Sequence, residues 1–432
     1  MKVELKNINK IRNASIELNS LTVIAGANDS GKSTVGKVLF STIKALISGL
    51  SDSDEQKKEV INERTTSLIR RLNTLRMDKE TDEKRRELFN FEFRHQLQQK
   101  NISDLNQIIK EREEWLNSLD IAPRQKMLAL KDLNAIKTLL TESANYSTRV
   151  KAEFQSYIES EFLNNICSVK TDNSSIKYDS DKSFVNIKLS ANEVTDIIYE
   201  MNSESVLDDI TYVESPLYIH LLDALLRTTT YREVEKERLT PSLMFSPMVA
   251  THIKDIATKL DYSSKYLRTK GQRNDIFNIK SITGGSFAYD SNSRSLVWKK
   301  NNRSFSPINV ASGIKSFGMI QLLLEADMIN ENKMLIWDEP ENHLHPKWQV
   351  EFAHLLVNLA KAGIPVVVSS HSPYFIQGIR YFSRKEQIDK YVNYYLAEET
   401  EDGLANINEV TNDLNRVFTK LAEPLNEIMN LE

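Results

Sequence analysis

Apolar and polar positions follow two different periods along this chain, and the change of period divides the chain into parts. Residues 1–25 alternate apolar and polar twice, which predicts a hairpin that leads into a third strand. That third strand, Leu21–Ala25, is an apolar, β-branched run and is expected to be buried. A helical spacing follows it through Val35, Val38 and Leu39. The N-terminal part is therefore predicted to be strands followed by a helix.

Apolar residues then recur at steps of three and four over residues 51–166, a stretch without glycine in which charges of both signs mix. This pattern predicts a helical insertion. Its mixed charge is typical of a solvated surface, whereas the alternation of Phe89, Phe91 and Phe93 is compatible with a surface for a partner protein. A second helical insertion is predicted over residues 217–272.

Strand patterns surround the two helical stretches. Strands are predicted over Ser175–Leu189, Ile210–Val213, the meander of Ile276–Ile282, Ser286–Tyr289 and Ser295–Trp298, and the later runs Met334–Trp337, Pro365–Val368 and Val392–Ala397. The predicted fold class is therefore α/β. Residues 1–50, 167–216 and 273–432 are expected to form one head, interrupted by the two helical insertions.

Composition narrows the class of protein. The chain has 432 residues, of which 40% are hydrophobic and 27% are charged, as in globular proteins with two or so cores. The net charge of -4 gives no overall basic field for nucleic acid. A single cysteine, Cys167, excludes an internal disulfide and suits a reducing compartment. Because we find neither a signal sequence nor an apolar run of about 20 residues, we expect a cytoplasmic protein without a membrane partner.

A glycine-rich phosphate loop follows the strand Leu21–Ala25. It reads G-A-N-D-S-G-K-S-T and comprises Gly26, Ala27, Asn28, Asp29, Ser30, Gly31, Lys32, Ser33 and Thr34. A strand that ends at glycines and opens into a helix directs backbone N–H groups and the positive end of the helix dipole at one point. Lys32 is expected to reach the β- and γ-phosphates, and Ser33 to bind magnesium. The sequence thus predicts a nucleoside triphosphate and Mg²⁺ as ligands.

Two later strands carry candidate catalytic residues at their ends. The run Met334–Trp337 continues into Asp338 and Glu339, and the carboxyl end of a buried strand faces the crevice in which an α/β sheet holds its ligand. We expect Asp338 in the magnesium shell and Glu339 beside the attacking water. The strand Pro365–Val368 leads to His371, which is expected to bond the γ-phosphate. The alternative for His371 is a structural role at a capped strand end.

A second helix start with the character of an anion site lies at Ser312 and Gly313. Ser312 is expected to be the N-cap, and Gly313 to leave the first N–H groups uncovered. Because the chain already has one phosphate loop, this second site is best explained if it closes on the nucleotide of another copy. The predicted assembly is an ATP-sandwich homodimer or a larger homo-oligomer.

The order of these motifs resembles the ABC-type ATPase heads of the SMC, RecF and OLD (overcoming-lysogenisation-defect) group. The stretch Asp338–Gln349 is particularly similar to OLD-like ATPases of bacterial anti-phage systems of the Septu, PARIS and retron types, which accompany an effector nuclease. The resemblance covers residues 1–48 and 275–380. After His371 we find no acidic pattern of a Toprim nuclease domain. The resemblance therefore implies an ATPase subunit with a separately encoded effector, a nuclease or a toxin.

The resemblance also implies a role for each matched residue of the nucleotide site. Lys32 and Ser33 bind phosphate and magnesium, and Asp338 completes the metal site. Glu339 activates water, and His371 senses the γ-phosphate. These groups provide the positioning and the charge neutralisation that phosphoryl transfer requires.

The remaining roles implied by the resemblance lie between two copies of the chain. Ser312 and Gly313 act in trans, and the loop with Asn342 and His343 communicates between the two sites. The signature reads S-G-I-K-S and lacks the second glycine of transporter-type heads. This departure makes Lys315 an additional candidate for a phosphate contact.

Three alternatives stay open at this point. A RecF- or SMC-like ATPase that acts in DNA repair or recombination would carry the same motifs, which keeps nucleic acid as a possible partner. The cytosolic subunit of a transporter would also carry them, although an insertion of this length after the phosphate-loop helix is unusual there. The pair His343 and His345 has the character of metal ligands, but a third ligand at matched spacing is missing.

Overall fold

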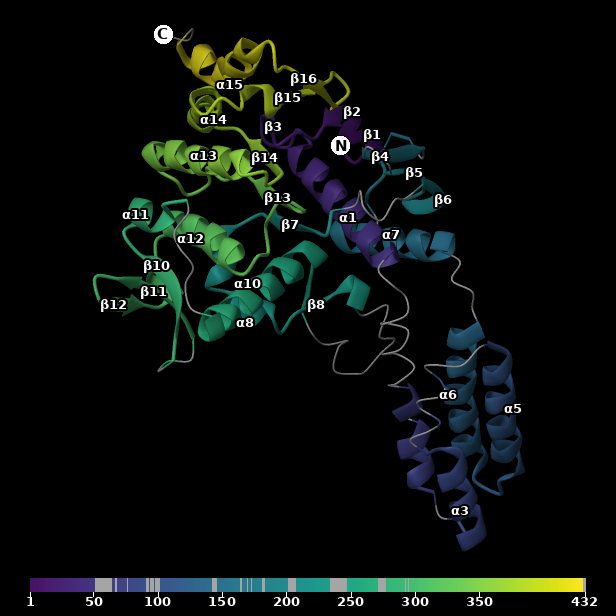
Figure 1. The fold of residues 1–432 in the computed structure, drawn as a ribbon. Coiled ribbons are helices and arrows are strands. Elements are labelled where there is room, and N and C mark those ends of the chain that lie inside the picture. The colour runs from purple at the N-terminus through teal and green to yellow at the C-terminus, as the bar shows by residue number, and fades with distance from the viewer. Residues whose placement is uncertain are drawn as a thin grey trace. The chain divides into compact units, whose positions relative to one another are not determined.

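The computed structural model divides the chain into two compact units. The head unit comprises Met1–Gly49 and Val150–Glu432, and the helical unit comprises Leu50–Arg149. The structure describes residues 1–50, 64–66, 68–75, 77–90, 93, 97, 102–141, 146–163, 165–168, 170–171, 173–180, 183–200, 207–233, 247–270, 277–291, 293 and 295–429. Figure 1 shows these residues coloured along the chain.

An 11-stranded mixed sheet is the framework of the head unit. The strand order is β6-β5-β4-β1-β2-β16-β15-β3-β14-β13-β7. The bounds are β1 (Lys2–Ile8), β2 (Ile11–Glu17), β3 (Leu21–Gly26), β4 (Ser174–Ser180), β5 (Ser183–Ser190), β6 (Glu193–Glu200), β7 (Asp209–Val213), β13 (Lys333–Asp338), β14 (Val366–Ser370), β15 (Val392–Glu399) and β16 (Ala405–Glu409). The predicted α/β class is confirmed.

The two halves of this sheet differ in strand direction. Strands β2, β1, β4, β5 and β6 pair antiparallel, whereas β15, β3, β14, β13 and β7 form a parallel block. The late strand β16 joins the halves, because it pairs antiparallel with β15 and parallel with β2. The predicted N-terminal hairpin and the strands predicted near β4, β5, β7, β13, β14 and β15 are confirmed, whereas β6 and β16 were not predicted.

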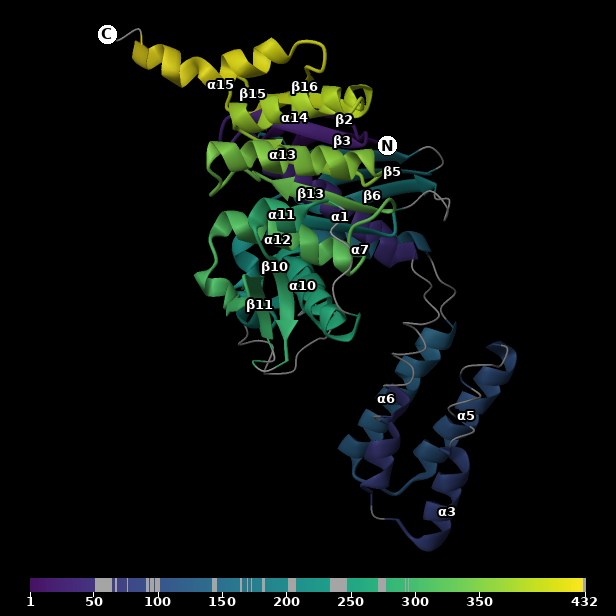
Figure 2. The ribbon, with the colours of Figure 1, turned by 60° about the vertical axis from the view of Figure 1, so that its left-hand side comes forward.

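Helices cover both faces of the parallel block (Figures 1 and 2). Leu335 and Trp337 share one core cluster with residues of the helices that follow β13 and β14. Ile336, which points to the other face of β13, packs against Gly36 of the helix that follows the phosphate loop. Burial on both faces explains why these strands are apolar at every position.

The helices of the head unit are α1 (Lys32–Leu50), α7 (Tyr146–Phe162), α8 (Leu222–Leu225), α10 (Thr251–Lys270), α11 (Ile279–Thr283), α12 (Ser312–Glu325), α13 (Pro346–Lys361), α14 (Pro373–Lys385) and α15 (Leu414–Met429), with 3₁₀ turns η2 (Pro216–Ile219), η4 (Pro307–Asn309) and η5 (Asp389–Tyr391). Strands β8 (Thr229–Thr230) and β9 (Met248–Val249) form a two-stranded sheet. Among the helices that the structure describes, none is long and apolar enough to cross a membrane.

A separate antiparallel sheet precedes α12. It consists of β10 (Ser286–Asp290), β11 (Ser295–Lys300) and β12 (Arg303–Phe305), so the last two strands of the predicted meander are confirmed. The prediction of a strand over Ile276–Ile282 is wrong, because Ile279–Thr283 form the helix α11. Ile276 lies outside the described residues. Asn278 before α11 and Gly284 after it both have positive φ, 56° and 73°, which ends any extended run there.

The helical unit has a core of its own. Its described helices include α3 (Lys79–Leu88), α5 (Ile102–Ser118) and α6 (Pro123–Thr141). Phe89 and Phe93 are buried, and their rings meet edge to face with centroids 5.5 Å apart. Arg112 covers the Phe93 ring at 4.3 Å from its centroid. The alternative of a partner surface is therefore not supported for Phe89 and Phe93, and Phe91 lies outside the described residues.

The helical unit is smaller than the predicted insertion over residues 51–166. It ends at Arg149, and most of α7 belongs to the head unit. Phe154, Tyr157 and Ile158 of α7 are buried, and the Tyr157 ring contacts Phe40 of α1 at 6.3 Å between centroids. This apolar face attaches α7 to the phosphate-loop helix.

We expect Phe93→Ala to destabilise the helical unit by about 3–5 kcal/mol, because the substitution leaves a cavity at a fully buried site. Limited proteolysis should then cut preferentially within residues 50–149, while the head unit keeps the resistance of the wild type. Met127→Ala is the control, since Met127 is 61% exposed. Equal cleavage of both units in the Phe93 variant would contradict two separate cores.

Candidate nucleotide site

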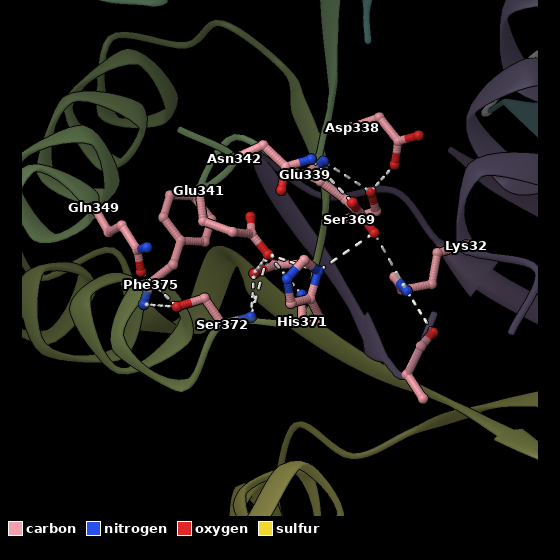
Figure 3. Close-up of polar contacts among 12 residues, drawn as sticks. Lys32, Asp338, Glu339, Glu341, Asn342, Gln349, Ser369, His371, Ser372 and Phe375 are labelled. Carbon is pink, nitrogen blue, oxygen red and sulfur yellow. Dashed lines mark hydrogen bonds and ion pairs between the residues drawn. The ribbon is translucent and has the colours of Figure 1, made fainter. Parts of the chain in front are cut away.

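Three parallel strands end together at the predicted site. Strand β14 lies between β3 and β13, and its Ser369 is paired with Asp338 on one side and with Ile24 on the other. The phosphate loop, Glu339 and His371 therefore leave the sheet at the same edge. Figure 3 shows Lys32, Asp338, Glu339 and His371 side by side at this edge. His371 directly follows β14, and β14 pairs with the acidic strand β13.

The phosphate loop depends on close backbone packing. Gly26 has φ 156°, and a Cβ there would lie 2.8 Å from Ser30 Oγ and 3.0 Å from the Ala397 carbonyl. Gly31 has φ 86° and lies against Ile11, with 2.9 Å between a Cβ and Ile11 Cγ1. Both positions therefore require glycine.

A small polar cavity of about 170 Å³ lies at the phosphate loop. It is lined by Asn9, Lys10, Asn28, Asp29, Ser30, Gly31, Lys32, Ser33, Thr34 and Glu339. Ala27, Asn28 and Asp29 are exposed, and α1 begins at Lys32. The free N–H groups of the first helical turn thus lie beside open space, as a phosphate site needs.

Lys32 is a buried ammonium with few partners of its own. Its Nζ donates to the Ala27 carbonyl at 2.6 Å and lies 3.7 Å from Glu339 Oε1. Burial lowers the pKa of Lys32, and the carboxylates of Glu339, Asp338 and Glu341 oppose that effect. A bound phosphate would supply the negative charge that this ammonium lacks.

Asp338 is held rigidly at the end of β13. It is buried, Tyr212 Oη donates to its Oδ2 at 3.1 Å, and Ser369 Oγ donates to its Oδ1. Burial raises the pKa of Tyr212 well above its usual value, so Tyr212 remains a donor. An oriented carboxylate together with the Ser33 hydroxyl supplies the oxygen ligands that Mg²⁺ prefers. These residues fit the predicted magnesium site.

Glu339 is surrounded by cations and donors. Its carboxylate lies 3.4 Å from His371 Nδ1, accepts from Asn342 Nδ2 at 3.0 Å and lies near Lys32. The interaction with His371 is the main reason why the pKa of Glu339 falls to about 2. Glu339 also has φ 46°, a left-handed backbone that turns the chain away from β13. The side chain is thus ionised and aimed at the phosphate loop.

His371 lies between two carboxylates. Its Nδ1 is 3.4 Å from Glu339 Oε1 and 3.4 Å from Glu341 Oε1, and 37% of its side chain is exposed. The nearby carboxylate of Glu339 raises the pKa of His371, and the charge of Glu341 adds to this effect. An imidazolium at this edge can donate to an anionic group. Sequence reasoning did not find Glu341, because its role depends on its contacts across strands.

A buried network behind β7 was also missed. His252 Nδ1 lies 2.6 Å from Glu161 Oε2, and its Nε2 lies 3.0 Å from Glu214 Oε2. Glu214 follows β7 directly, and its other oxygen is 3.8 Å from Lys37 of α1. The network therefore links α7, α10 and α1 beside the acidic strand. The signal in the sequence was only an acidic residue after a short strand.

The helix start with Ser312 and Gly313 differs in detail from the prediction. Ala311 is the N-cap of α12, and it makes no side-chain capping bond, so the predicted capping role of Ser312 is wrong. Extended backbone at Ala311 places the helix start one residue earlier than expected. Gly313 is buried against Leu344 and Trp348, and a Cβ there would lie 2.9 Å from Leu344 Cδ2. Gly313 thus permits contact between α12 and the loop after β13.

Lys315 points inward in this structure. It is buried, and its Nζ lies 3.1 Å from His220 Nδ1. Burial lowers the pKa of Lys315. In this arrangement the ammonium is not presented to a second copy of the chain, so a phosphate contact in trans would require its release. Asn342 and His343, in contrast, are exposed.

Among the described residues, no group of three His, Cys, Asp or Glu side chains could hold a metal ion. The pair His343 and His345 thus has no third ligand there. His345 instead caps α13, where its Nδ1 accepts from Lys347 N at 3.3 Å. The alternative of a zinc pair is not supported.

The network around His252 predicts a pH dependence of stability. Burial alone would lower the pKa of His252, but Glu161 and Glu214 outweigh it and raise the pKa to about 9. The folded state therefore binds the proton more tightly than the unfolded state. The resulting stabilisation, at most about 3 kcal/mol, is fully present below the unfolded pKa of about 6.5 and is lost as the pH rises through 9.

Urea unfolding of the wild type and of His252→Gln between pH 6 and pH 10 measures this effect. The free energy of unfolding of the wild type should fall more steeply above pH 7 than that of the variant. If both fall in parallel, His252 is not held as a buried cation.

Comparison with known proteins places the chain in a family. Residues 1–376 match the family AAA_15, described as AAA ATPase domain. A search of curated proteins gives no match. The match includes the phosphate loop, the acidic strand and His371.

A comparison with solved structures finds several to which the chain is similar. The SMC head domain from Thermotoga maritima has a TM-score of 0.41 at 10% identity and covers 95% of this chain and 98% of its own. An SmcHead bound to the C-winged helix domain of ScpA has a TM-score of 0.43 at 12% identity, with 96% and 98% covered. An Smc head domain with an extended coiled coil, bound to the C-terminal domain of ScpA derived from Pyrococcus furiosus, has a TM-score of 0.42 at 11% identity, with 99% and 98% covered.

The sheet order and the family agree with the predicted α/β class and with an ATPase that has a phosphate loop. The chain belongs to the AAA_15 family of AAA ATPase domains.

Proposed function

We propose that this ATPase hydrolyses ATP with Mg²⁺ and that nucleotide controls its assembly with further copies and with a separately encoded effector. The observation that carries the proposal is the meeting of Lys32, Asp338, Glu339 and His371 at one edge of the sheet. These residues come from three segments of the chain. Lys32 begins α1, Asp338 and Glu339 lie at the end of β13, and His371 follows β14. Such convergence of charges is typical of a phosphoryl-transfer site.

The chemistry follows from the contacts. Lys32 would exchange the Ala27 carbonyl and Glu339 for the β- and γ-phosphates, which releases the Glu339 carboxylate from its ion pair. Glu339 would then orient the attacking water, and His371 would donate to the γ-phosphate. Magnesium, held by Ser33 and Asp338, would neutralise phosphate charge. Asn342 keeps the Glu339 carboxylate in place at 3.0 Å.

A composite site between two copies is supported by what lines the cavity. Its walls come from the phosphate loop, the hairpin turn at Asn9 and Lys10, and Glu339, whereas the residues of α12 are not among them. The start of α12 packs instead beside Leu344, in the loop that exposes Asn342 and His343. We infer that Ser312 and Gly313 complete the cavity of a second copy.

The effector role is supported by the resemblance of Asp338–Gln349 to OLD-like ATPases of anti-phage systems. The helical unit is a second feature in its favour. It is a separate compact unit, inserted in the sequence between α1 and α7. We propose it as a contact region for an effector nuclease or toxin in anti-phage defence. The alternative, an SMC-like ATPase that acts on DNA, is distinguished by experiment.

We expect Glu339→Gln to bind ATP as tightly as the wild type and to lower kcat by about 10²-fold or more, because the neutral amide cannot accept a proton from water. Mass measurement by light scattering should show that the variant with ATP accumulates a larger assembly. Glu331→Gln, a change of the same charge at an exposed position, serves as the control. Full activity of Glu339→Gln, or ATP binding without any change in mass, would contradict the proposal.

Adding duplex DNA at two salt concentrations separates the two functions. An effector-controlling ATPase should show a turnover that DNA leaves unchanged, whereas an SMC-like ATPase should be stimulated, with a response that weakens steeply as salt increases. Co-purification with the products of neighbouring genes should yield a nuclease or toxin that ATP releases or retains. Strong stimulation by DNA together with no co-purified protein would favour the alternative.

A further inference from the structure

Glu341 is a buried carboxylate that the reaction as described above does not use. It lies in the loop between β13 and α13, and only 3% of the residue is exposed. Its Oε1 accepts three hydrogen bonds, from Ser370 Oγ at 2.7 Å, from His371 N at 2.7 Å and from Ser372 N at 3.1 Å. Three consecutive residues at the end of β14 are thus bonded to a single oxygen atom.

Within the part of the chain that the structure describes, the second oxygen of Glu341 has no hydrogen-bond partner. Oε2 is buried and makes no hydrogen bond, although a buried acceptor is normally satisfied. An unpaired buried oxygen destabilises the fold, and a carboxylate is therefore a poor choice if its only task were packing. This observation indicates that the position serves the site.

The hydrogen-bonded oxygen of Glu341, Oε1, also faces the His371 ring. Glu341 Oε1 and Glu339 Oε1 each lie 3.4 Å from His371 Nδ1. Glu341 thus fixes the backbone of His371 and faces the nitrogen that Glu339 contacts. The charged groups around the imidazole are Glu339, Glu341 and Lys32.

A second tie holds the same segments together. Ser372 Oγ donates to Gln349 Oε1 at 2.5 Å, and Gln349 Nε2 donates to the Leu344 carbonyl at 3.0 Å. The loop after β13 and the end of β14 are therefore bonded to each other at two places. These bonds tie the position of the loop to that of His371.

We propose that Glu341 is the positioning residue of His371: it fixes the strand end and the Nδ1 side of the ring, so that the histidine is oriented toward the γ-phosphate. This inference rests on the proposed hydrolysis of ATP. Glu341 touches neither the phosphate loop nor the proposed metal ligands in the contacts described, so it acts through His371. The role differs from that of Glu339, which faces the cavity itself.

Glu341→Gln tests the proposal, because the amide keeps the size of the side chain and removes its charge. We expect kcat to fall by about tenfold to a hundredfold, while KM for ATP changes by less than about twofold, since a small misplacement of a catalytic group costs this much. Glu341→Asp, which keeps the charge and shortens the reach, should also lower kcat. Glu331→Gln is the matched control, at an exposed position outside the site.

A second readout would not respond to a merely structural role. The titration of the His371 imidazole, followed by nitrogen NMR of histidine-labelled protein and assigned with His371→Gln, should move to lower pH in Glu341→Gln, since one carboxylate is lost. In Glu341→Asp it should stay closer to the wild type. Unchanged kcat and an unchanged titration in Glu341→Gln would overturn the proposal.

The two readouts separate this inference from the proposed function. If the wild type fails to hydrolyse ATP, the proposed function is wrong, and the imidazole titration still decides whether Glu341 governs His371. If the wild type hydrolyses ATP and the Glu341 variants have the same kcat and the same imidazole titration as the wild type, only the inference about Glu341 is wrong. Thermal unfolding of each variant identifies any loss of fold.

Discussion

The shared register of β3, β14 and β13 is the constraint on which the rest of the site depends. Because Ser369 is paired with both Ile24 and Asp338, the phosphate loop, His371 and Glu339 leave the sheet within a residue or two of one another. A shift of one residue would turn every side chain of the shifted strand to the other face. Burial of the three strands by α1 on one face and α13 on the other fixes that register.

Charged side chains of alternating sign neighbour one another at this edge of the sheet. Lys32, Glu339, His371 and Glu341 form a chain of neighbouring charges, in which Glu339 balances both cations. Burial lowers the pKa of Lys32, which shows that the ammonium is incompletely compensated. A triphosphate would compensate Lys32 and free Glu339 at the same time. In the proposed mechanism, one carboxylate would thereby link nucleotide binding to readiness for hydrolysis.

The sequence predicts those parts of the site that are continuous in the chain. The phosphate loop, Asp338 with Glu339, and His371 each follow an apolar strand, so local pattern suffices. The pattern fails where distant segments meet. Strand β16 pairs between β2 and β15, Tyr212 and Ser369 bond Asp338 from neighbouring strands, and Glu341 reaches across to β14. Such contacts depend on register, which no single segment encodes.

The central claim is that each nucleotide site needs two copies of the chain, and mixing two inactive variants tests it most directly. Lys32→Ala removes the phosphate contact, and Ser312→Glu places a negative charge where α12 would meet the partner's phosphate while remaining favourable at a helix start. In a mixed dimer one site is intact, so an equal mixture should regain about a quarter of wild-type turnover, whereas each variant alone stays inactive. A mixture no more active than its components, or full activity of Ser312→Glu alone, would contradict the claim.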